Sequence, residues 1–464
     1  MPFLSIDPLT GKLRESFPEL DAAGLDAVLG RVGRAAVGWA ETPIAVRCAA
    51  LRRLAAGLRA DASRLATIAA LEMGKPVRQG RAEIEKCAWV CEHYAEHAVP
   101  MLAPQRIETD AVRSYVRFEP MGAVLAIMPW NFPFWQVFRF AAPALAAGNV
   151  VLLKHAPNVP RCALEIERMA ALAGVVEGGF QTLFVSTQVA GELIGHPIVK
   201  AVTFTGSTRA GAEIAARAGR ALKKSVLELG GSDPFLVRAD ADVAQVARAA
   251  AQARTQNAGQ SCIAAKRFVV VHELADAFVE ALRRELEGLR VGDPQQEDTD
   301  VGPLAREDLL HTLDAQVRRS IDGGAKLVTG GYRLPGSGFH YAPTLLDGVR
   351  PGMAVADEET FGPVAAVMRV KDDGEAVAVA NQSAYGLGAS VWSRNLGAAE
   401  ALAARIESGS VFVNGMVKSD PRLPFGGVKQ SGYGRELSVQ GLHEFVNVKS
   451  VWVGRADPEP ARGG

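Results

Sequence analysis

Residues 122–155 read GAVLAIMPWNFPFWQVFRFAAPALAAGNVVLLKH and contain two short apolar runs, at 122–128 and 149–153, on either side of a helical stretch that begins near Trp135. An apolar run without polar alternation is typical of a strand buried on both faces. Similar runs follow at 180–185, 201–204 and 225–227, with helical stretches beginning near residues 160, 189 and 210. Buried strands that alternate with helices predict a parallel sheet of the doubly wound type.

The segment 120–138 also permits a different interpretation, because it carries no charged side chain and is long enough to span a bilayer. Pro129, Asn131 and Pro133 stand in its middle. They would break a continuous helix and leave backbone polar groups without partners in lipid. We therefore expect a buried strand, a sharp turn and a buried helix, and no association with a membrane.

A second α/β series is expected after Pro234. Helices are predicted at 241–256, 273–288 and 397–407, and strands at 267–271, 326–329, 364–370 and 410–413. Residues 20–102 have the spacing of an N-terminal helical layer. Residues 111–119 alternate apolar and polar side chains as an exposed hairpin does, 445–453 is strand-like, and the polar tail 456–464 is expected to be loose.

Composition and charge exclude several classes of protein. The chain has 464 residues, 48% of them hydrophobic, so a large core is expected; 51 basic side chains balance 51 acidic ones. Zero net charge offers no general attraction for nucleic acid or an anionic membrane. The five cysteines have neither disulfide nor zinc spacing, and the N-terminus lacks the pattern of a signal peptide. These features predict a cytoplasmic protein without a metal site.

Three side chains are candidates for covalent chemistry. Cys262 follows a small polar turn between a helix and a strand, Glu228 ends a buried strand beside two glycines, and Asn131 lies in a turn stiffened by prolines. They could serve as nucleophile, base and oxyanion donor. Each also has a structural alternative. Cys262 could be a small buried hydrophobic residue, Glu228 could lie at a solvated strand end, and Asn131 could form hydrogen bonds only within its own turn.

The turn 206–211, Gly-Ser-Thr-Arg-Ala-Gly, closes a strand and opens a helix, so its backbone N–H groups could meet a phosphate. No lysine follows the second glycine, and G-x-G-x-x-G is absent from the sequence. A triphosphate-binding loop is therefore not expected.

Six short motifs occur in order along nearly the whole chain. They are Pro129-Trp130-Asn131-Phe132-Pro133, Phe204-Thr205-Gly206-Ser207, Leu227-Glu228-Leu229-Gly230-Gly231, Gly259-Gln260-Ser261-Cys262, Glu359-Thr360-Phe361-Gly362-Pro363 and Pro424-Phe425-Gly426-Gly427. Together they resemble the signature series of the NAD(P)-dependent aldehyde dehydrogenase superfamily. The resemblance implies two doubly wound domains, a Rossmann-like cofactor domain and a catalytic domain, with a small bridging β element for oligomerisation.

The resemblance also assigns roles to individual residues. It implies that the Cys262 thiolate attacks an aldehyde, that the Asn131 amide and the Cys262 backbone N–H hold the oxyanion, and that Glu228 activates water to hydrolyse the thioester. The cofactor NAD or NADP would be bound by Trp130, Lys154, Pro157, Gly206, Ser207, Leu229, Glu359 and Phe361. Many members that prefer NAD have a glutamate where this chain has Pro157. We therefore expect both cofactors to be accepted and leave the preference open.

The substrate expected from the resemblance is succinate semialdehyde. Arg139, two helical turns after Asn131, and Ser419 match residues that bind the distal carboxylate in the succinate-semialdehyde dehydrogenase branch, and the stretch Lys154-His155-Ala156 is similar to that branch. Gln256 stands where the branch often has a second arginine, and Ser261 completes the expected substrate site. A structural ion pair is the alternative for Arg139. Replacing Arg139 by Leu is then expected to affect acidic aldehydes more than neutral ones.

The expected domains are 1–110 with 120–230 for the helices and the cofactor, 231–430 for catalysis, and 111–119 with 440–456 for a homodimer or homotetramer. Other aldehydes and a CoA-acylating reaction are alternative functions. A non-catalytic relative and a cysteine protease are disfavoured, because Cys262 and Glu228 are both present and no histidine stands in a recognisable motif.

Overall fold

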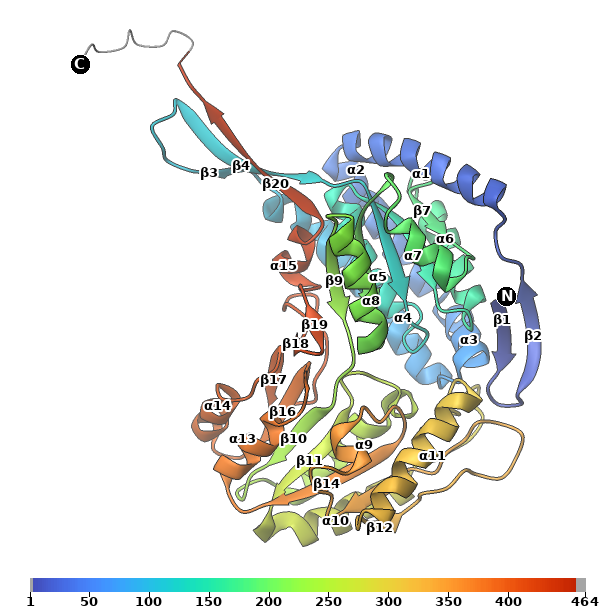
Figure 1. Ribbon diagram of the computed structural model, residues 1–464, viewed down its shortest axis with the longest axis vertical. Helices are drawn as coiled ribbons and strands as arrows, with labels where there is room; N and C mark the ends of the chain where they lie inside the picture. Colours follow the sequence, from blue (N-terminus) through green and yellow to red (C-terminus); the bar gives the residue numbers. More distant parts are fainter. Residues whose placement is uncertain (1–2, 456–464) are drawn as a thin grey trace.

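A computed structural model describes residues 3–455 and contains two large sheets (Figure 1). The first has six strands in the order β19-β9-β8-β5-β6-β7. All neighbours are parallel except β19, which runs antiparallel to β9. The strands are β5 (Ala123–Met128), β6 (Val150–His155), β7 (Phe180–Thr182), β8 (Val199–Thr205), β9 (Lys224–Glu228) and β19 (Gly432–Tyr433).

The strand order of this sheet reverses at β5. The chain continues from β5 to β6 and β7 on one side and then returns to place β8 and β9 on the other. Open α/β sheets bind ligands outside the carboxyl ends of the strands at such a reversal. Strand β5 ends just before the turn that holds Asn131, and β8 ends just before Gly206. The topology therefore brings both predicted turns to one edge of the sheet.

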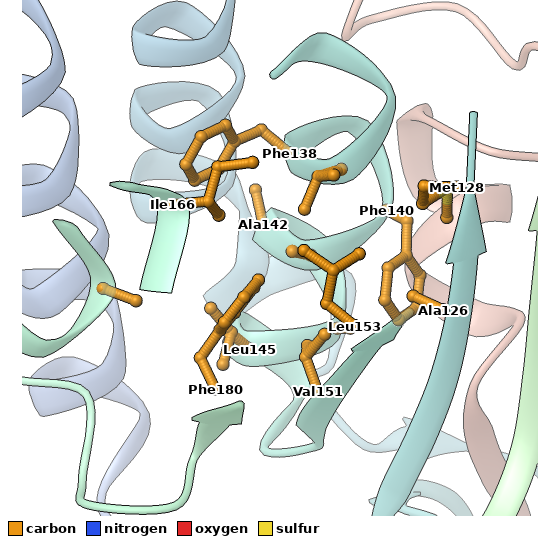
Figure 2. Close-up of a cluster of buried hydrophobic side chains, with 14 of the residues drawn as sticks. Ala126, Met128, Phe138, Phe140, Ala142, Leu145, Val151, Leu153, Ile166 and Phe180 are labelled. Carbon is orange, nitrogen blue, oxygen red and sulfur yellow. The ribbon is translucent and has the colours of Figure 1, made fainter. Parts of the chain in front are cut away.

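Helix α5 (Trp135–Ala147) is buried along its whole length, which explains the uncharged segment before Arg139. Figure 2 shows Phe138 and Leu145 of this helix in a cluster with Leu153 of β6 and Phe180 of β7. The helices that share this core or cover the sheet are α1 (Ala22–Glu41), α2 (Ile44–Ala60), α3 (Ala62–Met73), α4 (Val77–Met101), α6 (Pro160–Leu172), α7 (Thr187–Leu193), α8 (Thr208–Arg220) and α15 (Ser438–His443).

The second large sheet has seven strands in the order β12-β13-β14-β11-β10-β16-β17, parallel except for β12 at one edge. Its strands are β10 (Asp233–Val237), β11 (Ala265–Val271), β12 (Lys326–Thr329), β13 (Thr344–Asp347), β14 (Val364–Val370), β16 (Gly388–Trp392) and β17 (Ser410–Val413). The accompanying helices are α9 (Val243–Thr255), α10 (His272–Glu287), α11 (Glu307–Asp322), α12 (Ala354–Asp357), α13 (Asp373–Asn381) and α14 (Leu396–Ala403).

A three-stranded sheet projects from the rest of the molecule (Figure 1). Strand β4 (Arg113–Pro120) pairs along its whole length with β20 (Val446–Val453) and at one edge with the short β3 (Gln105–Arg106). Segments more than 300 residues apart in the chain therefore form one element. Two smaller pairs are β1 (Phe3–Asp7) with β2 (Lys12–Phe17) and β15 (Tyr385–Gly386) with β18 (Val428–Lys429).

The predicted fold class, α/β with two doubly wound and mainly parallel sheets, is confirmed. Most predicted helices and strands coincide with observed ones to within a few residues, but the hairpin expected at 111–119 is wrong: β4 is a single strand there, and it pairs with β3 and β20. Elements that were not anticipated include β1, β2, β10, β13, β16, α11, α12, α13 and α15. The segment 120–138 ends β4, forms β5 and begins α5, so the bilayer interpretation is wrong for it. Between residues 3 and 455 no helix combines the length and apolar character needed to cross a membrane. The expected loose tail, 456–464, lies outside the described residues.

Candidate active site

A cavity of about 390 Å³ lies between the domains that contain the two large sheets, and the predicted nucleophile, Cys262, lies in its wall. Its wall includes Cys262 and all four residues predicted to contact the substrate, namely Arg139, Gln256, Ser261 and Ser419. They come from helix α5, from the turn after α9 and from the segment that follows β17. The structure therefore brings together five residues that span 280 positions of the sequence.

The turn before Cys262 has an unusual backbone. Asn257 and Ala258 adopt left-handed conformations, with φ of 56° and 53°, and Gly259 follows with φ of 73°. Non-glycine residues in this region store backbone strain and often occur at functional sites. A side chain at Gly259 would lie 2.3 Å from the carbonyl oxygen of Gly362, so the turn packs directly against the loop that carries Glu359 and Phe361.

Lys266 fixes the other side of this turn. Its buried ammonium donates to the carbonyl oxygens of Ser261, Cys262 and Ala264, at 3.0, 2.8 and 3.2 Å. One cation thus holds three carbonyl groups of this turn, and Cys262 itself lines the cavity.

Cys262 differs from the other four cysteines of the chain, which are fully buried, because its side chain is only partly covered. Burial of the thiol nevertheless raises its pKa to about 12, against the opposing charges of Arg139 and Lys266. The thiol is therefore protonated at neutral pH in this conformation, and its activation requires a base or a change in its surroundings.

Asn131 is buried and joined to the nucleophile turn. Its side-chain Nδ2 donates to the backbone carbonyl oxygen of Gln260 at 3.0 Å. The backbone carbonyl oxygen of Asn131 accepts from Asn257 Nδ2 at 2.6 Å. Asn131 is not part of the cavity wall itself, but a side-chain amide has two N–H groups, so one remains after the bond to Gln260.

We expect Asn131→Ala to lower kcat/KM for aldehydes by about 10²–10³-fold, since it removes one oxyanion donor. Steady-state kinetics with thermal unfolding as a control checks this, because the same variant also loses the bond to Gln260. A fall in melting temperature with kcat/KM retained would show that Asn131 is structural.

Glu228 lies in a buried cluster of charges behind the cavity. Neither of its carboxylate oxygens has a hydrogen-bond partner among residues 3–455. Burial raises its pKa well above the ordinary value; the charge of Arg139 opposes this shift and that of Glu436 adds to it. Glu228 is not part of the cavity wall itself, but a carboxylate with a raised pKa is suited to accept a proton near neutral pH.

Arg139 forms a buried ion pair with Glu436, and its guanidinium lies 4.5 Å from the centre of the Phe425 ring. Of the two expectations for Arg139, a substrate carboxylate or a structural ion pair, the structure contains the ion pair. Its charge is thus already matched within the protein, although the side chain lines the cavity.

The glycines after Glu228 are required by close packing. A Cβ at Gly230 would lie 2.7 Å from Glu359 Oε2, and one at Gly231 would lie 2.5 Å from the Cys262 carbonyl oxygen. The Gly231 N–H also donates to Glu359 Oε1 at 3.0 Å. Burial raises the pKa of Glu359. This double glycine therefore allows Glu359 and the nucleophile turn to approach each other.

The other residues predicted to bind the cofactor lie at the carboxyl edge of the first sheet. Trp130 packs edge-on against Phe361, with ring centroids 5.7 Å apart. Ser207 caps helix α8, and the Leu229 side chain fills the space beside Gly211 in its first turn. Gly206 donates to the Glu228 carbonyl oxygen at 3.0 Å. The sheet edge thus joins the region of Cys262 to the turn that is predicted to bind an anion.

A second pocket of about 460 Å³ contains Lys154 and Pro157. Its wall also carries Asn158, whose side-chain oxygen and nitrogen are buried without a hydrogen-bond partner in the described part of the chain. Unsatisfied polar atoms in a pocket fit a polar ligand such as a ribose. Glu19 lies in the same wall, so a carboxylate is present here although Pro157 supplies none.

Sequence reasoning did not identify three residues of these sites. They are Glu436, the partner of Arg139; Glu19, in the wall of the second pocket; and Lys86, in the wall of the cavity that contains Cys262. Glu436 stands in a glycine-rich run beside the last recognised motif, which is a weak signal. Lys86 and Glu19 have no local pattern that separates them from surface charges. In residues 3–455 no three His, Cys, Asp or Glu side chains cluster as metal ligands would.

Comparison with known proteins identifies the family of the chain. The sequence model of the aldehyde dehydrogenase family matches residues 2–451. The chain is 48% identical to the probable succinate-semialdehyde dehydrogenase (NADP+) of Synechocystis sp., over 98% of this chain and 100% of that one. It is 45% identical to the succinate semialdehyde dehydrogenase (NAD(P)+) Sad of Escherichia coli, over 97% of this chain and 98% of that one.

Among solved structures, the succinic semialdehyde dehydrogenase of Streptococcus pyogenes in complex with NADP+ superimposes with a TM-score of 0.95 at 37% identity, over 98% of this chain and 100% of that one. The whole fold is therefore shared. The chain belongs to the aldehyde dehydrogenase family.

Proposed function

We propose that this protein oxidises succinate semialdehyde to succinate with NADP or NAD. The observation that carries the proposal is the position of Cys262, in a cavity that also holds cationic side chains and whose nucleophile turn is bonded to Asn131. The names of the two similar enzymes from Synechocystis sp. and Escherichia coli support the choice of substrate. Comparing kcat/KM for succinate semialdehyde with that for butanal, which has four carbons but no carboxylate, tests it.

In the proposed mechanism the Cys262 thiolate attacks the aldehyde carbon, and the oxygen becomes an oxyanion held by Asn131 Nδ2 and the Cys262 N–H. A nicotinamide cofactor held by the predicted residues would supply the hydride acceptor, and loss of hydride from the adduct would leave a thioester on Cys262. Glu228 then takes a proton from water, and the resulting hydroxide displaces the thiolate to release the acid.

The residues expected to hold the cofactor line two connected regions. Lys154 and Pro157 would meet the adenosine ribose in the second pocket, Gly206, Ser207 and Leu229 the pyrophosphate, and Trp130, Glu359 and Phe361 the nicotinamide end. The orphaned polar atoms of Asn158 and the amino terminus of α8 at Ser207 support this orientation.

We expect both cofactors to be used, with discrimination against NADP below about 100-fold, because a like charge facing the 2′-phosphate costs several kcal/mol and position 157 is a proline. Pro157→Glu should lower kcat/KM for NADP far more than for NAD. Glu19→Gln should change the ratio in the opposite direction, since it removes the carboxylate that the pocket holds and so favours NADP. Steady-state kinetics with both cofactors measures these ratios, and a wild-type preference for NAD above that limit would contradict the expectation.

We also propose that the protein is a homodimer or homotetramer in a reducing cytoplasm. The projecting sheet of β3, β4 and β20 supports the oligomer, because its strand β20 exposes the large apolar side chains Val448 and Trp452, at 58% and 60%. A free catalytic thiol supports the compartment. Sedimentation equilibrium distinguishes a dimer from a tetramer.

A further inference from the structure

Lys86 lies on helix α4, and its side chain lines the cavity that contains Cys262. The ammonium Nζ donates to Ser419 Oγ at 2.8 Å and lies 4.2 Å from the centre of the Trp135 ring. The residue is half-buried. A lysine that turns its charged end into a cavity instead of toward solvent needs a favourable partner there.

The ion pairs of the cavity leave Lys86 without a carboxylate. Arg139 pairs with Glu436, Lys75 with Glu83, and Arg422 with Asp420 at 2.6 Å. In residues 3–455 no carboxylate oxygen lies within 4.0 Å of Lys86 Nζ. Lys418, the other lysine of the wall without an ion pair, is exposed to solvent. Lys86 is therefore the half-buried positive charge of this cavity wall that forms no ion pair with a carboxylate of the described residues.

The hydroxyl of Ser419 provides a second, independent observation. Its oxygen accepts from Lys86 Nζ and, at 3.0 Å, from Trp135 Nε1. Both of these groups can only donate, so the hydroxyl hydrogen must point to a third atom. No acceptor for that hydrogen is found in the described part of the chain. The Ser419 hydroxyl hydrogen thus lacks an acceptor, and the adjacent Lys86 ammonium has further N–H groups beyond the one that it donates to Ser419.

We propose that Lys86 and the Ser419 hydroxyl bind the carboxylate of the substrate, so that Lys86 sets the preference for acidic aldehydes. The inference rests on the proposed function and adds a residue from α4 to its substrate site. Gln256, in the same wall, is neutral and contributes no charge to this end of the cavity. Arg139 then acts as the partner of Glu436 and influences the charges near Cys262 and Glu228.

The test compares kcat/KM for succinate semialdehyde and for butanal in wild type, Lys86→Met and Lys418→Met. We expect Lys86→Met to lower the ratio of the two values by about 10–100-fold, the size typical for a lost hydrogen bond to a charged group. Lys418→Met, which removes an exposed charge from the same wall, should keep the wild-type ratio. Lys86→Arg should restore part of the preference, because it keeps the charge.

Arg139→Met provides the contrasting result. It leaves Glu436 buried without its partner, so we expect lower kcat/KM for both aldehydes and a lower melting temperature, with the ratio changed less than in Lys86→Met.

A second measurement needs no variant. Burial and the charge of Arg139 lower the pKa of Lys86 to about 8. The other titratable or charged groups that face Lys86 are Glu83, Cys87 and Asp420. A lysine binds a carboxylate only while protonated, so the wild-type ratio should fall as the pH rises above about 8. Effects of Cys262 and Glu228 cancel in the ratio, since both serve either substrate.

The outcomes separate the two proposals. If wild type does not prefer succinate semialdehyde to butanal, the proposed substrate is wrong and this role of Lys86 is wrong with it. If wild type has the preference and folded Lys86→Met keeps it, only the role of Lys86 is overturned. Should Lys86→Met fail to fold, a wild-type ratio that stays constant from pH 7 to pH 10 overturns the role instead.

Discussion

Glu228→Gln is expected to convert the enzyme into one that completes a single turnover and then stops. The thiol of Cys262 is retained, so the aldehyde is still oxidised to the thioester, and the reduced cofactor appears in a burst of one equivalent per active site. Hydrolysis of the thioester lacks its base, and the steady-state rate should fall by about 10³-fold. Rapid mixing with detection of the reduced nicotinamide at 340 nm measures both phases.

Adding hydroxylamine provides the control, because this nucleophile attacks a thioester without the help of a general base. It should restore turnover in Glu228→Gln more than in wild type. Addition of CoA tests the alternative reaction class: an acyl-CoA product in wild type would mean that the acyl group is not transferred to water. A variant that shows no burst would contradict the assignment of Glu228 to the hydrolytic step.

The pH dependence of this step follows from the surroundings of Glu228. Burial raises the pKa of the carboxyl group, and a base acts only when deprotonated. Hydrolysis of the thioester should therefore accelerate as the pH rises through that raised pKa, whereas in Glu228→Gln it should lose this dependence.

The β5-α5-β6 unit could be predicted from the sequence because its signals are local. Strands β5 and β6 and helix α5 are each contiguous, and burial on all sides makes their residues apolar without interruption. Strand β13 has four residues, and β10 contains Pro234, which disfavours a strand in local reasoning. These short strands are stabilised by their neighbours in the sheet, which a local pattern does not reveal.

In the candidate site, too, some residues are marked by their local sequence, and the roles of others depend on contacts made only in the folded protein. Cys262, Asn131 and Glu228 stand in turns whose glycines and prolines mark them in the sequence. Arg139 also stood out, as a charge in an apolar helix, but its partner Glu436 lies 297 positions later and joins it through the assembled fold. The unpaired charge of Lys86 becomes visible only when the ion pairs of its neighbours are known, because α4 also contains two arginines and four glutamates that look alike in the sequence.

Cys262→Ala is expected to lower kcat for aldehyde oxidation by at least about 10⁴-fold, because the oxyanion donors cannot form the covalent adduct without the thiol. Cys48→Ala, which removes a buried thiol of helix α2, is the matched control and should retain activity. Loss of activity in both variants would indicate a general effect on the fold.

Alkylation of the cofactor-free protein tests the environment of the same thiol. Burial raises the pKa of Cys262 to about 12, so the thiolate fraction, and with it the rate of reaction with iodoacetamide, should increase about tenfold per pH unit between pH 7 and pH 10. The other four cysteines are fully buried, so one equivalent should be incorporated by native protein and none by Cys262→Ala. A rate that levels off near pH 7 would mean that the resting thiol is already ionised, and activation by the surroundings would then precede substrate binding.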